Sequence, residues 1–152
     1  MKIVPAVPRM AATLTEIAWE AKRFWGYPDE WMEAWRDELL VTADVIQAHE
    51  TWVAERSGRQ VGFYVLRRLP DGSGAIDHLW VRPDSMRLGI GSRLLEHALD
   101  RAHAAEMSAV SIVSDPNAEV FYLRHGARRV GVETGTVCGR PRELPVLAIS
   151  PE

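Results

Sequence analysis

The most constraining feature of the sequence is a strand-like segment, residues 75–83, followed by a glycine-bearing turn and a long amphipathic segment up to Ala105. The first segment, Ala-Ile-Asp-His-Leu-Trp-Val-Arg-Pro, is rich in β-branched and aromatic residues, which is typical of a strand. The last segment repeats apolar residues every three or four positions, which predicts a helix. Gly89 and Gly91 lie where this helix begins, and free N–H groups together with the helix dipole favour an anion there. A strand, a glycine turn and a helix N-terminus together predict a phosphate-binding site.

Two well-known phosphate-binding motifs do not fit this spacing. The P-loop needs four residues between its glycines and a Lys-Ser/Thr pair after them, whereas Ser92 follows Gly91 with no lysine. The dinucleotide-binding fingerprint needs a third glycine, and its position is occupied by Leu94. On these residues alone, a third interpretation stays open: the glycines only let the helix begin tightly against a sheet.

Length, charge and cysteine usage narrow the class of protein. The 152 residues are expected to form one domain, residues 1–152. The net charge of -3 gives no electrostatic reason to expect a nucleic-acid or membrane partner. The single Cys138 cannot form an internal disulfide, no signal-peptide pattern is found, and no apolar run reaches membrane-spanning length. His49, His103 and His125 lack metal-ligand spacing. We therefore expect a cytoplasmic protein without a metal.

Periodicity and turn residues divide the rest of the chain into short elements. Strands are expected at residues 2–7, 51–55, 60–66, 75–83, 109–113, 130–133 and 144–149, and helices at 11–25, 29–40, 44–49, 90–105 and from 115 onward. Pro5 and Pro8 favour an edge position for the first strand. The last two strands are expected to flank a connection over Gly135–Pro141.

Segments along the whole chain resemble the GNAT superfamily of N-acetyltransferases. Met86-Arg87-Leu88-Gly89-Ile90-Gly91 is similar to the superfamily's Gln/Arg-x-x-Gly-x-Gly/Ala signature, with Met86 where Gln or Arg is usual and Arg87 as a neighbouring cation. Residues 115–127 resemble its Asp-Pro-Asn-Ala-x-x-Phe-Tyr-x-x-x-Gly-Ala segment. Residues 22–27 resemble the Ser-Lys-Ala-x-Trp-Gly-Tyr segment of a bacterial subgroup.

This resemblance implies both a fold and an activity. The fold is α/β (α+β): a mixed, mostly antiparallel sheet of six to seven strands, flanked by helices on both faces. The activity is transfer of an acetyl group from acetyl-CoA to a primary amine by direct attack in a ternary complex. The aromatic N-terminal helices favour a closed pocket for a small molecule. A protein N-terminal or lysine acetyltransferase and a non-catalytic acyl-CoA-binding or sensor module stay open as alternatives, and so does a homodimer.

The resemblance also implies which residues bind the ligands. Cofactor contacts are expected from the main chain of Trp80, Val81, Arg87, Leu88, Gly89, Ile90, Gly91 and Ser92, and from Asn117 and Tyr122. Trp25, Tyr27 and Trp31 are expected to form a wall of the acceptor pocket. The alternative for these aromatic residues is that they pack helices onto the sheet.

Tyr122 is the candidate general acid for the departing thiolate. A phenol with a pKa of about 10 stays protonated until it donates. The alternative is a core tyrosine whose hydroxyl is bonded to the backbone.

Asp77 and His78 are the candidates for the catalytic base. On strand 75–83, alternation places Asp77, Leu79 and Val81 on one face, and Ile76, His78 and Trp80 on the other. Related enzymes carry a Glu or His on the Asp77 face, so Asp77 is the expected base, acting directly or through water. His78 has the more suitable intrinsic pKa, but its face is expected to meet the helix after the glycine turn. The alternative for both is a strand polar group bonded to an arginine or the backbone.

Overall fold

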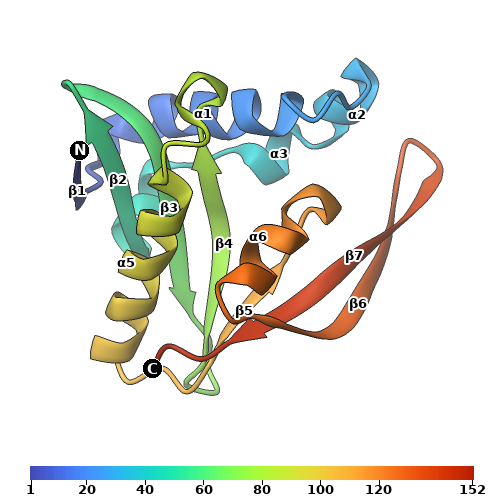
Figure 1. Cartoon of the computed structure of the whole chain (residues 1–152). Coiled ribbons are helices and arrows are strands. Elements are labelled where there is room, and N and C mark those ends of the chain that lie inside the picture. Colours follow the sequence, from blue (N-terminus) through green and yellow to red (C-terminus); the bar gives the residue numbers. More distant parts are fainter.

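A computed structural model describes all residues, 1–152, as an open seven-stranded sheet with helices on both faces (Figure 1). The strands are β1 (Lys2–Pro5), β2 (Glu50–Arg56), β3 (Arg59–Arg68), β4 (Gly74–Val81), β5 (Val110–Val113), β6 (Arg128–Val137) and β7 (Arg140–Ile149). Their order in the sheet is β1-β2-β3-β4-β5-β7-β6, and only the β4–β5 pair is parallel. The expected fold class and the edge position of β1 are confirmed.

The helices divide between the two faces of the sheet. They are η1 (Pro8–Met10), α1 (Ala11–Arg23), α2 (Asp29–Ala34), α3 (Arg36–Leu39), α4 (Ala43–Ala48), η2 (Pro83–Ser85), α5 (Ile90–Ala104), η3 (Pro116–Ala118) and α6 (Glu119–Arg124). One core lies between the sheet and α1–α4, and a second lies between the sheet and α5 with α6. The apolar stripe predicted for α5 is buried, including Leu94 and Leu95, which are 0% exposed. No helix combines the length and the hydropathy that a bilayer-spanning segment requires.

Two segments differ from the sequence-based expectation. The expected helix over 29–40 is divided at Trp35 into α2 and α3, and Trp35 itself is buried. The expected connection over Gly135–Pro141 is instead paired strand on both sides of a tight turn at Cys138 and Gly139, whose φ angles are 47° and 76°. Positive φ at both positions matches the twist of a hairpin, so the turn needs only these two residues.

A β-bulge in β4 changes which of its residues share a face. Val65 of β3 pairs with His78 and Leu66 pairs with Ile76, so Asp77 is an extra residue without a partner. The bulge places Ile76 on the same side as Leu79, against the α5 core, which strict alternation does not allow. The expected orientation of His78 toward α5 is also wrong, because α1–α4 cover the face that His78 shares with Trp80: its ring lies 5.8 Å from that of Phe63 in the α1–α4 core.

Candidate active site

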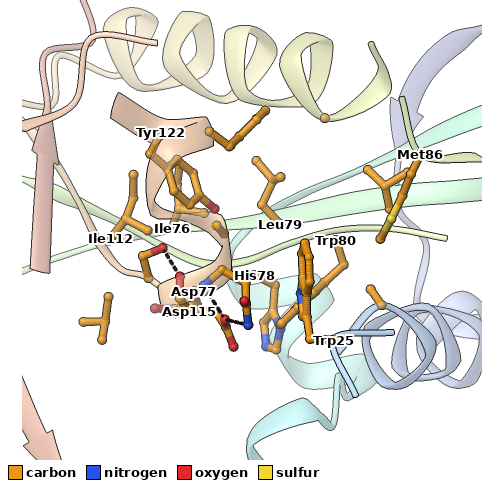
Figure 2. A pocket seen from close by; sticks show the side chains of 18 residues that line it. Trp25, Ile76, Asp77, His78, Leu79, Trp80, Met86, Ile112, Asp115 and Tyr122 are labelled. Carbon is orange, nitrogen blue, oxygen red and sulfur yellow. Dashed lines mark hydrogen bonds between the residues drawn. The ribbon is translucent and has the colours of Figure 1, made fainter. Parts of the chain in front are cut away.

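A cleft opens where β4 and β5 separate. These strands pair only at Gly74–Val110 and Ala75–Ser111, and β4 then continues to Val81 without a partner on that side. The separation leaves a largely apolar cavity of about 280 Å³ between β4, β5, the turn before α5, and α6 (Figure 2). Free backbone groups along this part of β4 can therefore pair with an extended ligand.

The turn before α5 leaves its backbone N–H groups free. Arg87 and Gly89 have φ angles of 64° and 78°, and Gly89 precedes the helix with no side chain capping it. The hydrogen-bond ladder of α5 begins at Arg93, whose N–H donates to the carbonyl of Gly89 at 3.1 Å. The preceding N–H groups have no intrahelical partner, as expected at a helix start. The positive end of the α5 dipole adds to their attraction for an anion.

Gly91 places this turn at the mouth of the cleft. A Cβ built on Gly91 would lie 3.5 Å from the Phe121 ring, and Gly91 itself lines the cavity. A Cβ on Gly89 would meet nothing within 4 Å, so a ligand can approach the backbone there. The turn and the apolar cleft thus suit a ligand with a diphosphate and a long, thin, mostly apolar arm.

The residues expected to bind the cofactor divide into three groups. Trp80, Val81, Gly91, Asn117 and Tyr122 line the cleft, whereas Arg87, Leu88, Gly89 and Ser92 belong to the turn and first helical positions beside it. Ile90 is 3% exposed, so only its main chain can contribute. Met86, which replaces the usual Gln or Arg of the signature, lines the cleft (Figure 2).

Tyr122 presents its hydroxyl to the cleft. The residue is buried on α6, its ring lies 5.1 Å from that of Phe121, and its oxygen points into the cavity (Figure 2). This hydroxyl forms no hydrogen bond with a protein group, so the alternative of a backbone-bonded core tyrosine does not describe it. Burial raises the pKa of the phenol, which keeps it protonated at neutral pH.

Asp77 forms an ion pair across the bulge. One of its carboxylate oxygens accepts from Nε of Arg67 at 2.7 Å, and the other accepts from Nη2 at 3.2 Å. This matches the alternative of a strand polar group bonded to an arginine. Each oxygen still has a second lone pair, so Asp77 can also accept a proton or a water.

His78 is a neutral imidazole with a defined tautomer. Its Nδ1 lies 3.0 Å from Nε1 of Trp80, and because an indole N–H can only donate, Nδ1 accepts. In the neutral ring the proton is then on Nε2. Burial lowers the pKa of His78 below its ordinary value of 6.5, against the opposing effect of Asp77.

A second cavity of about 370 Å³ lies between the N-terminal helices and the β6–β7 hairpin. In Figure 1 this hairpin extends away from the sheet toward α2, and Sγ of Cys138 at its tip donates to the Glu30 carbonyl at 3.5 Å. Five residues line both cavities: Asp77, His78, Trp80, Val113 and Asp115. The two cavities therefore meet along one strip at the bulge of β4 and the end of β5.

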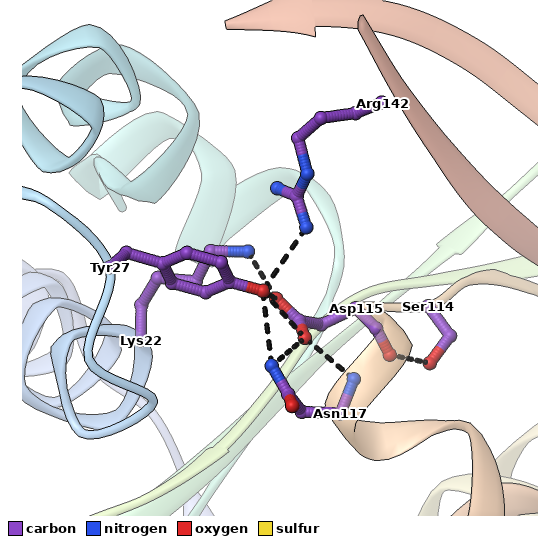
Figure 3. Close-up of polar contacts among 6 residues, drawn as sticks. All are labelled: Lys22, Tyr27, Ser114, Asp115, Asn117 and Arg142. Carbon is purple, nitrogen blue, oxygen red and sulfur yellow. Dashed lines mark hydrogen bonds and ion pairs between the residues drawn. The ribbon is translucent and has the colours of Figure 1, made fainter. Parts of the chain in front are cut away.

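A polar network joins four distant segments beside this strip (Figure 3). The Asp115 carboxylate accepts from Lys22 Nζ at 2.6 Å, from the Tyr27 hydroxyl at 2.9 Å and from the Asn117 N–H at 2.8 Å. The Tyr27 oxygen in turn accepts from Nη2 of Arg142 at 3.1 Å. Burial alone would raise the pKa of Asp115, but the Lys22 ammonium and these hydrogen bonds hold it below 3.8. The carboxylate is therefore ionised throughout the physiological range.

The three aromatic residues expected to form a wall of the acceptor pocket do not line one cavity together. Trp25 lines the β4–β5 cleft, while Tyr27 and Trp31 line neither cavity. Their rings stack at 5.9 Å and support the polar network instead. Trp35 forms part of the second cavity.

Sequence reasoning did not identify Lys22, Trp35, Asp115 or Arg142 as site residues. For Asp115 it predicted a helix cap, and the carboxylate does accept from the N–H of Asn117 at the start of η3. Lys22 lies in the segment that resembles the bacterial subgroup, but nothing local links Lys22 to Asp115 or Arg142 to Trp35, because these partners are far apart in the sequence.

Sequence and fold comparisons agree on the family. A model of the acetyltransferase (GNAT) family matches residues 11–127, and the chain belongs to this family. It is therefore an N-acetyltransferase of a family whose acetyl donor is acetyl-CoA. No protein with a curated function is significantly similar in sequence.

Three solved structures illustrate the similarity of fold. A GCN5-related N-acetyltransferase from Rhodopseudomonas palustris has a TM-score of 0.82 at 23% identity, covering 98% of this chain and 94% of that one. PaiA N-acetyltransferase from Thermoplasma acidophilum, solved with coenzyme A, has a TM-score of 0.75 at 17% identity, with 98% of each chain covered. YncA from Salmonella typhimurium, a putative acetyltransferase solved with acetyl-CoA, has a TM-score of 0.74 at 20% identity, covering 100% of this chain and 94% of that one.

Proposed function

We propose that this protein transfers the acetyl group of acetyl-CoA to the primary amine of a small molecule, by direct attack in a ternary complex. The observation that carries the proposal is the meeting of two cavities at one strip of residues. A donor in the β4–β5 cleft and an acceptor in the second cavity would face each other there. Such an arrangement brings the two reactants together without a covalent enzyme intermediate.

The binding residues follow from the geometry of the cleft. The free N–H groups around Gly89, Ile90 and Gly91 would hold the diphosphate, and the unpaired edge of β4 at Trp80 and Val81 would pair with the pantetheine arm. Asn117 would contribute less than the sequence suggests, because its side-chain amide donates to Asp115 at 2.9 Å and to Tyr27 at 3.1 Å. Bound acetyl-CoA supplies an activated acyl thioester.

Proton transfer is assigned to two residues. Tyr122, protonated and without a protein partner, donates its proton to the leaving sulfur. Asp77 accepts the proton that the amine loses, directly or through water, with a lone pair that Arg67 does not use. His78 has its proton on Nε2 and its Nδ1 bonded to Trp80, so it acts as a hydrogen-bond donor at the strip rather than as the base.

Thiol release from acetyl-CoA across a panel of small amines, with short peptides included, tests the proposal. We expect release with small amines and slower or no release with peptides, because the second cavity is bounded by the helices and the hairpin. Preference for peptides would make the protein a protein acetyltransferase. Tight binding of acetyl-CoA with no release by any amine would point to an acyl-CoA-binding or sensor module.

Cellular location and assembly remain proposals from the sequence. The cytoplasm is kept as the proposed location and the homodimer as the candidate assembly. Light scattering from the purified chain, with and without acetyl-CoA, measures its oligomeric state directly.

A further inference from the structure

Arg142 of β7 is an unpaired cation in the second cavity, which is the proposed acceptor site. Lys22 and Arg142 are the lysine and the arginine of that lining; Lys22 is paired with Asp115 at 2.6 Å, whereas Arg142 forms no ion pair. Only its Nη2 is engaged, as a donor to the Tyr27 hydroxyl at 3.1 Å. A guanidinium has five N–H donors, so most of its hydrogen-bonding capacity is left for a ligand.

Aromatic rings hold this guanidinium in place. Its central carbon lies 5.0 Å from the centroid of the Tyr27 ring and 4.9 Å from that of Trp35, both at cation–π distance. A half-buried, stacked arginine loses little side-chain freedom when it binds. Its planar fork matches a carboxylate in a bidentate pair.

Carboxylates line other parts of the same cavity. Glu38 of α3 and Glu133 of β6 line it and form no ion pair or side-chain hydrogen bond, and Asp77 lies at the strip where the two cavities meet. One free cation and several carboxylates in one cavity complement a ligand that carries both an ammonium and an anion. A polyamine would instead place a second cation against Arg142.

We propose that the acceptor is a small amine that also bears a carboxylate, such as an amino acid, and that Arg142 binds this carboxylate. The proposal rests on the acetyl transfer proposed above and names its substrate class. A carboxylate is favoured over a phosphate because Lys22, the second cation that a dianion would need, is already neutralised by Asp115.

Matched pairs of acceptors test this directly. Amino acids are compared with the amines formed by removing their carboxylate, for example phenylalanine with phenethylamine and lysine with cadaverine, in the thiol-release assay. Wild-type enzyme should prefer a carboxylated partner by about tenfold or more in kcat/KM, the scale of a hydrogen-bonded charge pair. In Arg142→Gln this preference should disappear through a higher KM, while acetyl-CoA affinity is unchanged. Arg142→Lys should restore part of it.

Arg140→Gln is the matched control, because Arg140 is an exposed, unpaired cation on the same strand that lines neither cavity. It should keep the wild-type preference. Calorimetry of the same acceptor pairs with the CoA-loaded protein gives a readout that needs no turnover.

Three outcomes of the thiol-release assay would overturn the assignment of Arg142. They are equal use of both members of every pair, an equal loss for both members in Arg142→Gln, and a preference for O-phosphoethanolamine over β-alanine. Failure of carboxylated amines to bind the CoA-loaded protein would also overturn it. Absence of transfer to any amine, with Arg142-dependent binding intact, would contradict only the proposed transferase activity.

Discussion

The two cavities that meet at β4 are built in opposite ways. The β4–β5 cleft is mostly apolar, and its polar contacts come from main-chain groups of one strand edge and one helix start. The second cavity is lined by charged side chains from six segments, and its polar contacts include hydrogen bonds between side chains that are far apart in the sequence. Main-chain contacts suit the part of the ligand that is common to every acyl-CoA donor. Side chains can change with the acceptor while the fold stays the same.

The largest effect is expected in the β4–β5 cleft, from Tyr122→Phe. If the hydroxyl donates to the leaving sulfur, turnover should fall by about a hundredfold or more, the usual scale for a general acid. Acetyl-CoA affinity and the urea midpoint should not change, because the hydroxyl has no protein partner to lose. Single-turnover thiol release measures the chemical step. Full turnover with chemistry rate-limiting would remove Tyr122 from the mechanism.

The free energy of unfolding should depend on the ion pair between Lys22 and Asp115 beside the second cavity. Asp115→Ala leaves the Lys22 ammonium buried without its partner, and we expect it to lower the free energy of unfolding by about 3–5 kcal/mol. Urea unfolding measures this loss. The combined variant Lys22→Met/Asp115→Ala should recover part of it, and no recovery would show that the pair is not the cause.

The pH dependence of stability tests the same carboxylate. The pKa of Asp115 is lowered in the folded protein, so its stabilising contribution is present above its ordinary value of 3.8 and is lost as the pH falls through the lower folded value. The free energy of unfolding should therefore fall more steeply below pH 3.8 in the wild type than in Asp115→Asn. Parallel curves for the two proteins would contradict the shift.

Acetyl-CoA affinity should depend on the size of the side chain at Gly91, at the mouth of the β4–β5 cleft, rather than on its charge. Gly91→Leu fills the mouth of the cleft, and we expect acetyl-CoA affinity to fall by about tenfold to a hundredfold, which corresponds to the cost of about 1–3 kcal/mol for overfilling a packed space. Gly91→Ala should have a smaller effect, since its Cβ meets Phe121 at an ordinary 3.5 Å. Calorimetry measures both. Unchanged affinity in Gly91→Leu would refute the phosphate-binding turn.

The smallest effect is expected for the base. Asp77→Asn should lower kcat/KM by about tenfold, less than the usual range for a general base, because water can also carry the proton away. Steady-state thiol release measures this loss. Arg67→Gln breaks the same ion pair but keeps the carboxylate, so it should retain more of the wild-type kcat/KM than Asp77→Asn does.

His78, if it were the base, would leave a distinct signature in the pH profile of kcat/KM. Because burial lowers its pKa, a limb set by His78 would lie below pH 6.5 and would be lost in His78→Gln. We expect the pH profile of His78→Gln to match that of the wild type, because His78 is assigned as a hydrogen-bond donor. If neither Asp77→Asn nor His78→Gln lowers kcat/KM, neither residue is the base.

The parts that could be read from the sequence are those that depend on neighbouring residues. The buried stripes of α1 and α5 follow from apolar residues at helical spacing, and the turn at Gly89 follows from two glycines where a helix begins. The sheet class follows from the resemblance to the family, and the fold confirms it.

What the tertiary structure alone decided is where distant side chains meet. Lys22 and Asp115 are 93 positions apart, and Tyr27 and Arg142 are 115 apart, so no local pattern could pair them. The bulge at Asp77 arises from pairing with β3 and moves Ile76 to the face opposite to the one that alternation predicts. Local periodicity determines which surface an element buries. The packing of separate elements determines which charges are neutralised and which, like Arg142, remain available to a ligand.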